Sequence, residues 1–316
     1  MQRRSSIVIA ITAFYCFLGL AQGADNVRIA VPEPNAAYLT FPLAHKKGFF
    51  TQQNIAAEVF LMRGTLTMAA LNNGDINYLA DISQGVRGSI GGLPVKIVAC
   101  YLPRSSLMVV SRAEINSVKD LKGKAVAVSG KNLGMLQLIA RHFGLDPKTE
   151  IKVLAVGTNE ARLAVLKQGL VAATVVPPPW DFHAKKLGFH VIARSYDLFN
   201  YPQVGLIVND RKMKESREEI KRIIKAGIEA NRYIRSNREG TVQFLMEWMR
   251  TEKDVAVATY EALLPAFNDD GNCPEDGMRL VIDGAKNAAK VSRDVSVKDV
   301  ADSSILKEAQ RDLGIK

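Results

Sequence analysis

The sequence predicts an α/β protein built from two similar halves. The prediction rests on short apolar strands that alternate with amphipathic helices, and on a weak internal repeat. The order strand, Gly-Thr, helix, glycine turn, strand occurs over residues 57–80 and again over residues 151–176. Strands and helices that alternate at this length form right-handed βαβ units and parallel sheets. Two such units indicate two α/β domains whose strand carboxyl ends face a common cleft, where open sheets bind ligands.

In the first half, each predicted strand is an apolar run that ends at a turn signal. Prolines follow the first strand, Gly48 ends the first helix, and Thr65 is suited to cap the second helix. The predicted strands are Val27–Val31, Ala57–Met62, Ile76–Ala80, Val95–Tyr101 and Leu107–Ser111. The predicted helices are Leu39–Lys46, Leu66–Asn72 and Gln84–Ile90.

The second half begins with the clearest unit of the chain, residues 124–144. Ala125–Val128 is a short apolar run bounded by glycines, as expected of a buried strand. One apolar helix face follows, formed by Leu136, Ile139, Ala140 and Phe143. The loop between them leads into a helix N-terminus, whose unpaired N–H groups suit the polar or anionic end of a small molecule. A plain strand-to-helix turn is the structural alternative.

The rest of the chain continues the alternation and then becomes helical. Further strands are predicted at Ile151–Val156, Val171–Val176, Leu187–Ala193 and Val204–Val208, and a helix with Asn159 as its cap at Glu160–Lys167. Tyr196–Tyr201 is a candidate hinge. Beyond residue 208, apolar residues recur at helical spacing and predict an α-rich tail.

The composition is that of a globular protein and argues against some functions. The chain has 316 residues, of which 47% are hydrophobic and 23% charged, and a formal net charge of +10. Cations and acids are interspersed, and no basic run carries interleaved aromatics, so nucleic acid is not an expected partner. The four histidines are scattered, and no Cys/His spacing is typical of a metal site.

Residues 1–24 have the pattern of a secretory signal peptide. Arg3 and Arg4 precede the apolar run Ile7–Leu20, and small residues follow it. We expect cleavage after Gly23 or Ala24 and a periplasmic location. Two cysteines remain in the mature chain, Cys100 and Cys273; they could pair in an oxidising compartment, but a single distant pair leaves this open.

Four phrases, in order, resemble one protein family. They are Pro42–Phe50 (PLAHKKGFF), Leu71–Asn77 (LNNGDIN), Val118–Val128 (VKDLKGKAVAV) and Val165–Ala173 (VLKQGLVAA). They resemble the periplasmic substrate-binding proteins of ABC importers, of the nitrate/sulfonate/taurine and thiamine-precursor type. Where many relatives carry an Asp before the final Ala of the last phrase, this chain has Ala172.

The resemblance implies a type II periplasmic-binding-protein fold. In that fold two mixed sheets, flanked by helices, form two lobes joined by two hinge strands that close over one ligand. By analogy, lobe one comprises residues 25–111 and 204–316, and lobe two residues 112–203. The implied function is capture of a small polar or anionic organic ligand and its delivery to an ABC permease with its ATPase. No cofactor is implied, and we expect a monomer.

The candidate ligand-binding residues each follow a predicted strand. They are Asn35, Tyr38, Gly64, Thr65, Asp81, Ser83, Ser129, Asn132, Leu133, Asn159 and Trp180. Hydroxyl and amide groups beside helix N-termini suit oxyanions or polar groups, and the two aromatic side chains could stack on a flat ligand. A helix cap or a packed loop is the alternative for each. Arg63 and Lys131 could neutralise an anion, whereas Asp81 would favour an amine.

Two other functions compete with transport. Thiamine-pyrimidine synthases resemble the same family, but such an enzyme needs reactive His and Cys residues together in the cleft. The histidines fall in or after predicted helices, and no Ser-His-Asp or paired-carboxylate arrangement stands out. A ligand-sensing ectodomain is the other alternative, and the sequence does not separate it from a transport protein.

Overall fold

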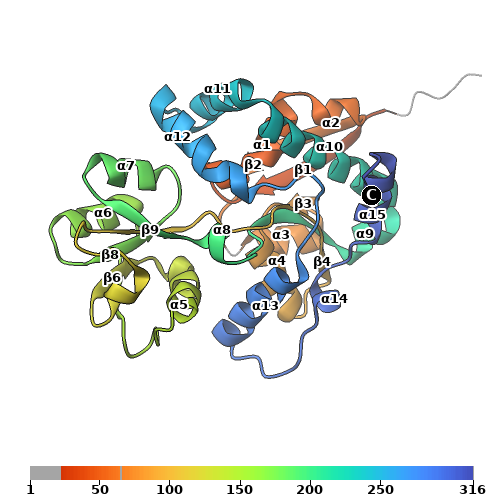
Figure 1. Cartoon of the computed structure of the whole chain (residues 1–316). Coiled ribbons are helices and arrows are strands. Elements are labelled where there is room, and N and C mark those ends of the chain that lie inside the picture. Colours follow the sequence, from red (N-terminus) through yellow and green to blue (C-terminus); the bar gives the residue numbers. More distant parts are fainter. Residues whose placement is uncertain (1–22, 65, 316) are drawn as a thin grey trace, which may run out of the picture.

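Two five-stranded sheets form two lobes that lie side by side (Figure 1). The computed structural model describes residues 23–64 and 66–315. Of the predicted signal peptide, only Gly23 and Ala24 fall within the described residues, and β1 begins at the next residue. The predicted fold class, two mixed sheets flanked by helices, is confirmed.

Lobe one contains the sheet β2-β1-β3-β10-β4. Its strands are β1 (Asp25–Val31), β2 (Ile55–Leu61), β3 (Tyr78–Leu79), β4 (Val95–Leu102) and β10 (Val204–Asn209). The strands β2, β1 and β3 are parallel, as the βαβ pattern predicts, whereas β10 is antiparallel to both β3 and β4. Side chains alternate along β1, so Ile29 enters one apolar core and Ala30 enters the core on the opposite face.

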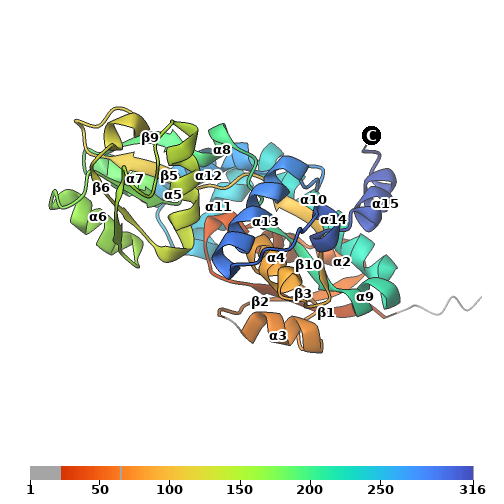
Figure 2. The ribbon, with the colours of Figure 1, turned by 90° about the horizontal axis from the view of Figure 1, so that it is seen from below.

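Helices cover both faces of this sheet (Figures 1 and 2). The first part of the chain supplies η1 (Ala36–Tyr38), α1 (Thr40–Lys46), α2 (Phe49–Gln52), α3 (Leu66–Asn73) and α4 (Ile82–Ile90). The predicted α-rich tail supplies α9 (Asp210–Glu215), α10 (Arg217–Ser236), α11 (Arg238–Met249), α12 (Lys253–Leu263), η4 (Leu264–Ala266), α13 (Glu275–Ala289), α14 (Val297–Val300) and α15 (Ser304–Asp312).

Lobe two contains the sheet β7-β6-β8-β5-β9. Its strands are β5 (Met108–Ser111), β6 (Ala125–Val128), β7 (Lys152–Ala155), β8 (Ala173–Val176) and β9 (His190–Arg194). Its helices are η2 (Val118–Leu121), η3 (Gly130–Asn132), α5 (Leu133–His142), α6 (Asn159–Lys167), α7 (Trp180–Lys186) and α8 (Ser195–Leu198). Strands β7, β6 and β8 are parallel, and β5 is antiparallel to β8 and β9.

The fourth strand of each sheet arrives from the other lobe. Strand β5 follows β4 of lobe one, and β10 follows β9 of lobe two, so the chain crosses between the lobes twice. The lobe boundary drawn after Ser111 was therefore wrong, because β5 pairs with β8 and β9. The first crossover lies between Leu102 and Met108, and the second between Leu198 and Val204.

Two local predictions also need correction, and a third cannot be compared with the structure. The strand predicted over Leu187–Ala193 begins only at His190, because Leu187 and Gly188 form the C-cap and turn that end α7 (Trp180–Lys186), a helix that the sequence pattern did not predict. The cap of α6 is Thr158, whose side chain accepts a hydrogen bond from Ala161 N at 3.2 Å, rather than Asn159. Thr65, the cap expected for α3, lies outside the described residues.

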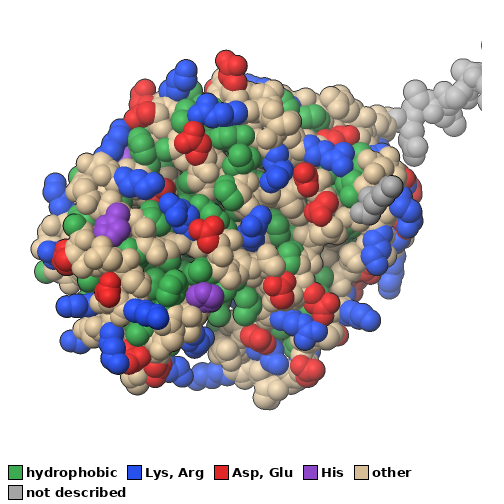
Figure 3. All heavy atoms as spheres, viewed as in Figure 1, with side chains coloured by type: hydrophobic (Ala, Val, Ile, Leu, Met, Phe, Trp, Pro, Cys, Tyr) green, Lys and Arg blue, Asp and Glu red, His purple; other side chains and the backbone are tan. Residues whose placement is uncertain are grey.

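Cys100 and Cys273 form a disulfide, a pairing that the sequence left open. Cys100 lies in β4, and Cys273 precedes α13, with 5.1 Å between their Cα atoms. The bond ties the helical tail to the sheet of lobe one. Across residues 23–64 and 66–315, no helix is both long and apolar enough to cross a membrane. On the face seen in Figure 3, basic and acidic side chains are intermingled.

Candidate functional site

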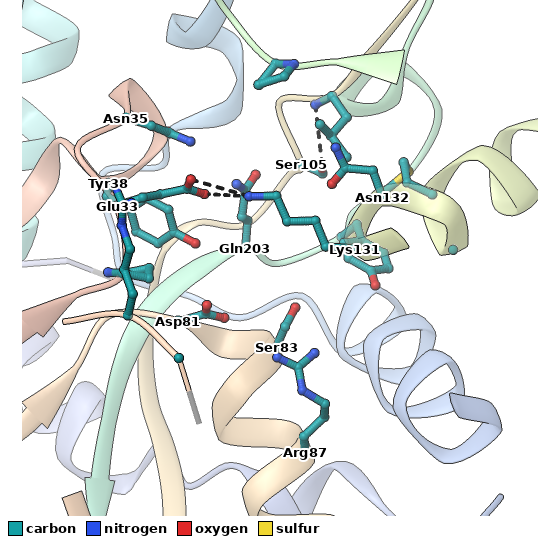
Figure 4. Close-up of a pocket in the computed structure, with 18 residues that line it drawn as sticks. Glu33, Asn35, Tyr38, Asp81, Ser83, Arg87, Ser105, Lys131, Asn132 and Gln203 are labelled. Atoms are coloured by element: carbon teal, nitrogen blue, oxygen red, sulfur yellow. Dashed lines mark hydrogen bonds and ion pairs between the residues drawn. The ribbon is translucent and has the colours of Figure 1, made fainter. Parts of the chain in front are cut away.

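A cavity of about 470 Å³ lies where the two lobes and the two crossovers meet. Both lobes contribute to its wall (Figure 4). It is lined by Pro32, Glu33, Asn35, Tyr38, Arg63, Gly64, Asp81, Ser83, Arg87, Ser105, Leu107, Lys131, Asn132, Gly134, Met135, Pro177, Tyr201 and Gln203. This is the size range of small-molecule sites, and polar groups predominate among its lining residues.

Lobe one supplies residues that follow β1 and β3. Asn35 caps η1 by accepting a hydrogen bond from Ala37 N at 2.8 Å. Asp81 caps α4, since its carboxylate accepts from the backbone and side-chain nitrogens of Gln84, both at 3.1 Å. The capping alternative thus holds for both residues, yet both also line the cavity. One helical turn after Ser83, Arg87 extends from α4 toward the same space (Figure 4).

Tyr38 is buried in this wall and stays protonated at physiological pH. Burial raises the pKa of Tyr38 well above its ordinary value, and the nearby carboxylates of Asp81 and Glu33 raise it further. Arg87 and a hydrogen bond with Gln203 act in the opposite direction. The hydroxyl is therefore a neutral group that can donate or accept a hydrogen bond.

Lobe two supplies the segment from η3 into α5. No side chain caps α5, although the backbone N of Leu133 donates to Gly130 O of η3, and Gly134 and Met135 of its first turn line the cavity. Asn132 is only 8% exposed, and its side-chain amide makes no hydrogen bond within the described part of the chain. A buried amide next to a helix N-terminus is suited to hold a polar or anionic group.

The crossovers form the part of the wall between the lobes. Gln203 belongs to the second crossover, and its Oε1 accepts from the backbone N of Ser106 in the first crossover at 3.3 Å. Its backbone N donates to Leu102 O at 2.9 Å, and its carbonyl accepts from Ile82 N at 3.2 Å. Gln203 therefore contacts the cavity, both crossovers and the start of α4.

Six of the predicted site residues line this cavity: Asn35, Tyr38, Gly64, Asp81, Ser83 and Asn132. Lys131 and Arg63, suggested as cations for an anionic ligand, line it as well. Thr65 lies outside the described residues. Four predicted residues lie elsewhere: Ser129, Leu133, Asn159 and Trp180.

These four have other surroundings. The side-chain oxygen of Asn159 accepts a hydrogen bond from the buried guanidinium of Arg162. Trp180 begins α7 and lies against His183 in a shallow groove beside α6. Leu133 packs on the core of lobe two. Ser129 is buried just before η3, and its hydroxyl has no hydrogen-bond partner among the described residues.

The sequence pattern did not identify several of the residues that line the cavity. Arg87 lies four residues after Ser83, so helical spacing from a residue already chosen could have identified it. Ser105 and Gln203 lie on the crossovers and follow no βαβ signal, and Tyr201 was expected only as part of a hinge segment, not as a cavity residue. Within residues 23–64 and 66–315, no cluster of three or more His, Cys, Asp or Glu is arranged to hold a metal ion.

Comparison with known proteins gives one family and one fold. Residues 35–240 match the family described as NMT1/THI5 like. A Brachyspira hyodysenteriae protein, whose name assigns it to the periplasmic binding proteins of ABC transporters, is 27% identical over 208 residues. That match covers 63% of this chain and 57% of the relative, so it spans less than three fifths of the relative's length.

Two solved structures share the fold over most of the chain. The periplasmic aliphatic sulphonate binding protein SsuA from Escherichia coli superposes with a TM-score of 0.73 at 18% identity, covering 88% of this chain and 92% of SsuA. The desulfurization enzyme DszB superposes with a TM-score of 0.67 at 14% identity, covering 92% and 99%. A binding protein and an enzyme thus share this architecture.

Proposed function

Because the chain belongs to the NMT1/THI5-like family, we propose that it is an extracytoplasmic solute-binding protein of an ABC importer. It captures a small polar or anionic organic molecule between its lobes and delivers it to a permease and its ATPase. The observation that carries the proposal is the cavity, whose wall combines side chains of both lobes with both crossovers. We expect the mature protein to act in the periplasm as a monomer.

The charges around the cavity favour an anionic ligand. Glu33 forms an ion pair with Lys131, and the carboxylate of Asp81 accepts two hydrogen bonds from Gln84. Arg63 and Arg87 have no ion-pair partner in the described part of the chain. Two unpaired guanidinium groups opposite the uncapped α5 would bind an anion whose other end accepts or donates hydrogen bonds.

The first test is native mass spectrometry of the signal-free protein purified without refolding. A single extra mass that is lost on denaturation would support binding and define the ligand class. Thermal-shift titrations with sulfonates, nitrate, aromatic acids, pyrimidines and amines then test the charge argument, because a ligand of the folded state raises the melting temperature. Stabilisation by amines alone would contradict it.

Three variants test whether this cavity is the binding site. Arg87→Gln should weaken binding of the stabilising anion about ten- to hundredfold, and Asn132→Ala about fivefold. Trp180→Ala is the matched control, since Trp180 lies outside the cavity. Equal losses in all three, or a loss in the control alone, would refute the assignment.

The enzymatic alternative shares the fold, so the same experiment must distinguish it. Binding predicts that the compound recovered after prolonged incubation has the mass of the compound added. A changed mass that requires the folded protein would instead support catalysis on this fold.

A further inference from the structure

Two ion pairs connect the lobes away from the crossovers. Lys131 of η3 lies 3.0 Å from the carboxylate of Glu33, which follows β1. Lys186 of α7 lies 2.7 Å from the carboxylate of Asp254 in α12. All other ion pairs between described residues join groups within one lobe.

The Glu33–Lys131 pair spans the ligand cavity. Both residues line it, and Figure 4 shows the Lys131 side chain reaching from lobe two across the cavity to Glu33. The ammonium group contacts both carboxylate oxygens, at 3.0 and 3.3 Å. The Lys131 side chain is 67% exposed and the Glu33 side chain 32% exposed, so solvent and salt reach the pair.

We propose that Glu33 and Lys131 form a strap that holds the lobes together over the cavity without help from a ligand. Both partners are side chains of the protein, so the pair forms whenever the lobes approach. Most of the apolar core of each lobe comes from that lobe, although Met108 and Tyr196 of lobe two join the core of lobe one. The lobes can therefore separate by rotation about the crossovers, and separation breaks the pair. The Lys186–Asp254 pair adds a second attachment on other elements.

The strap favours closure modestly. An exposed ion pair of this kind shifts an equilibrium about 1.5- to 5-fold, and salt weakens it. The ligand-free protein therefore samples both open and closed arrangements, and its closed fraction falls as salt rises. The role of the strap in ligand access rests on the proposed function, whereas the closure equilibrium does not.

Pulsed dipolar spectroscopy on the full mature chain tests the proposal without any ligand. Spin labels at Glu160→Cys in α6 and Glu239→Cys in α11 report the separation of the lobes. Glu33→Gln should lower the ratio of closed to open molecules about 1.5- to 5-fold at low salt. About 1 M NaCl should abolish most of the difference between this variant and the unaltered protein.

Two further variants make the result specific. The exchange Glu33→Lys with Lys131→Glu restores an ion pair across the cavity and should restore the closed fraction. Glu58→Gln is the matched control, because it breaks an exposed 3.0 Å pair with Arg28 inside lobe one and should leave the distances unchanged.

The proposal is overturned if Glu33→Gln and the unaltered protein give the same distances at low salt, or if the charge exchange fails to restore closure. Neither result bears on ligand binding, which the mass and thermal-shift measurements decide independently. Failure of the strap and failure of the solute-binding function are therefore distinguishable.

Discussion

Breaking the disulfide between Cys100 and Cys273 should strongly destabilise the protein. The two cysteines are 173 residues apart in the sequence, and the bond between them encloses lobe two and most of the helical tail. Loop-closure entropy grows with the logarithm of loop length, and a loop of this size corresponds to about 5 kcal/mol in the free energy of unfolding. That is comparable to the whole stability of many domains.

The expected loss is somewhat smaller than this figure, because other contacts also hold the tail against the sheet. Cys100 N donates to Gly271 O at 2.8 Å, and Asp302 N donates to Ile97 O at 2.9 Å. These bonds persist without the disulfide and retain some structure around it. We therefore expect a loss of about 3–5 kcal/mol.

Urea unfolding with and without reductant measures this loss. Cys273→Ser removes the disulfide without reductant and keeps the buried Cys100 side chain as a small apolar group. The reduced protein and the variant should unfold at the same urea concentration. A loss below about 1 kcal/mol in both would refute the argument from loop closure.

Four other substitutions have expected effects. In Gly227→Ala the new Cβ would lie 2.5 Å from the Tyr101 ring, so urea unfolding should show a loss of about 1–3 kcal/mol. In Gly284→Ala on α13 the new Cβ would make an ordinary contact with the Tyr201 hydroxyl at 3.8 Å, so this variant should be neutral or stabilising. Burial raises the pKa of the Asp181 carboxyl in the folded protein. Its ionisation therefore destabilises the fold: the loss of stability grows as pH rises from the ordinary pKa of an aspartate through the raised pKa, and it is absent below the ordinary pKa. Asp181→Asn should thus raise the melting temperature at about pH 7 but not at about pH 3, and equal gains at both would contradict this. Asn159→Ala should cost about 1–3 kcal/mol in urea unfolding by removing an acceptor from a buried guanidinium, with ligand affinity unchanged.

The local sequence pattern was sufficient to predict the structure where the residues that interact are also close in the sequence. Ala125–Val128 is the strand that its apolar run predicts, and the parallel units around β1 and β6 follow from the βαβ alternation. The same logic identified Asn35, Tyr38 and Asn132 as cavity residues, because the carboxyl ends of parallel strands meet at one edge of a sheet.

The arrangement of the site depends on contacts between distant parts of the chain. The residues of β5 indicate a buried strand, but its partners β8 and β9 come later in the sequence, so only pairing could assign it to lobe two. Gln203 reaches the cavity because the second crossover lies against the first.

The residue pattern alone was enough to predict the alternation of strands and helices, the resemblance to the family and the strand-end residues that offer hydrogen bonds. The tertiary structure decided where the lobes divide, that Cys100 and Cys273 pair, and that Lys131 meets Glu33 across the cavity. The physical reason is that periodicity and capping act within a few residues, whereas a disulfide or an ion pair between lobes needs two distant segments placed within a few ångströms by the packing of everything between them.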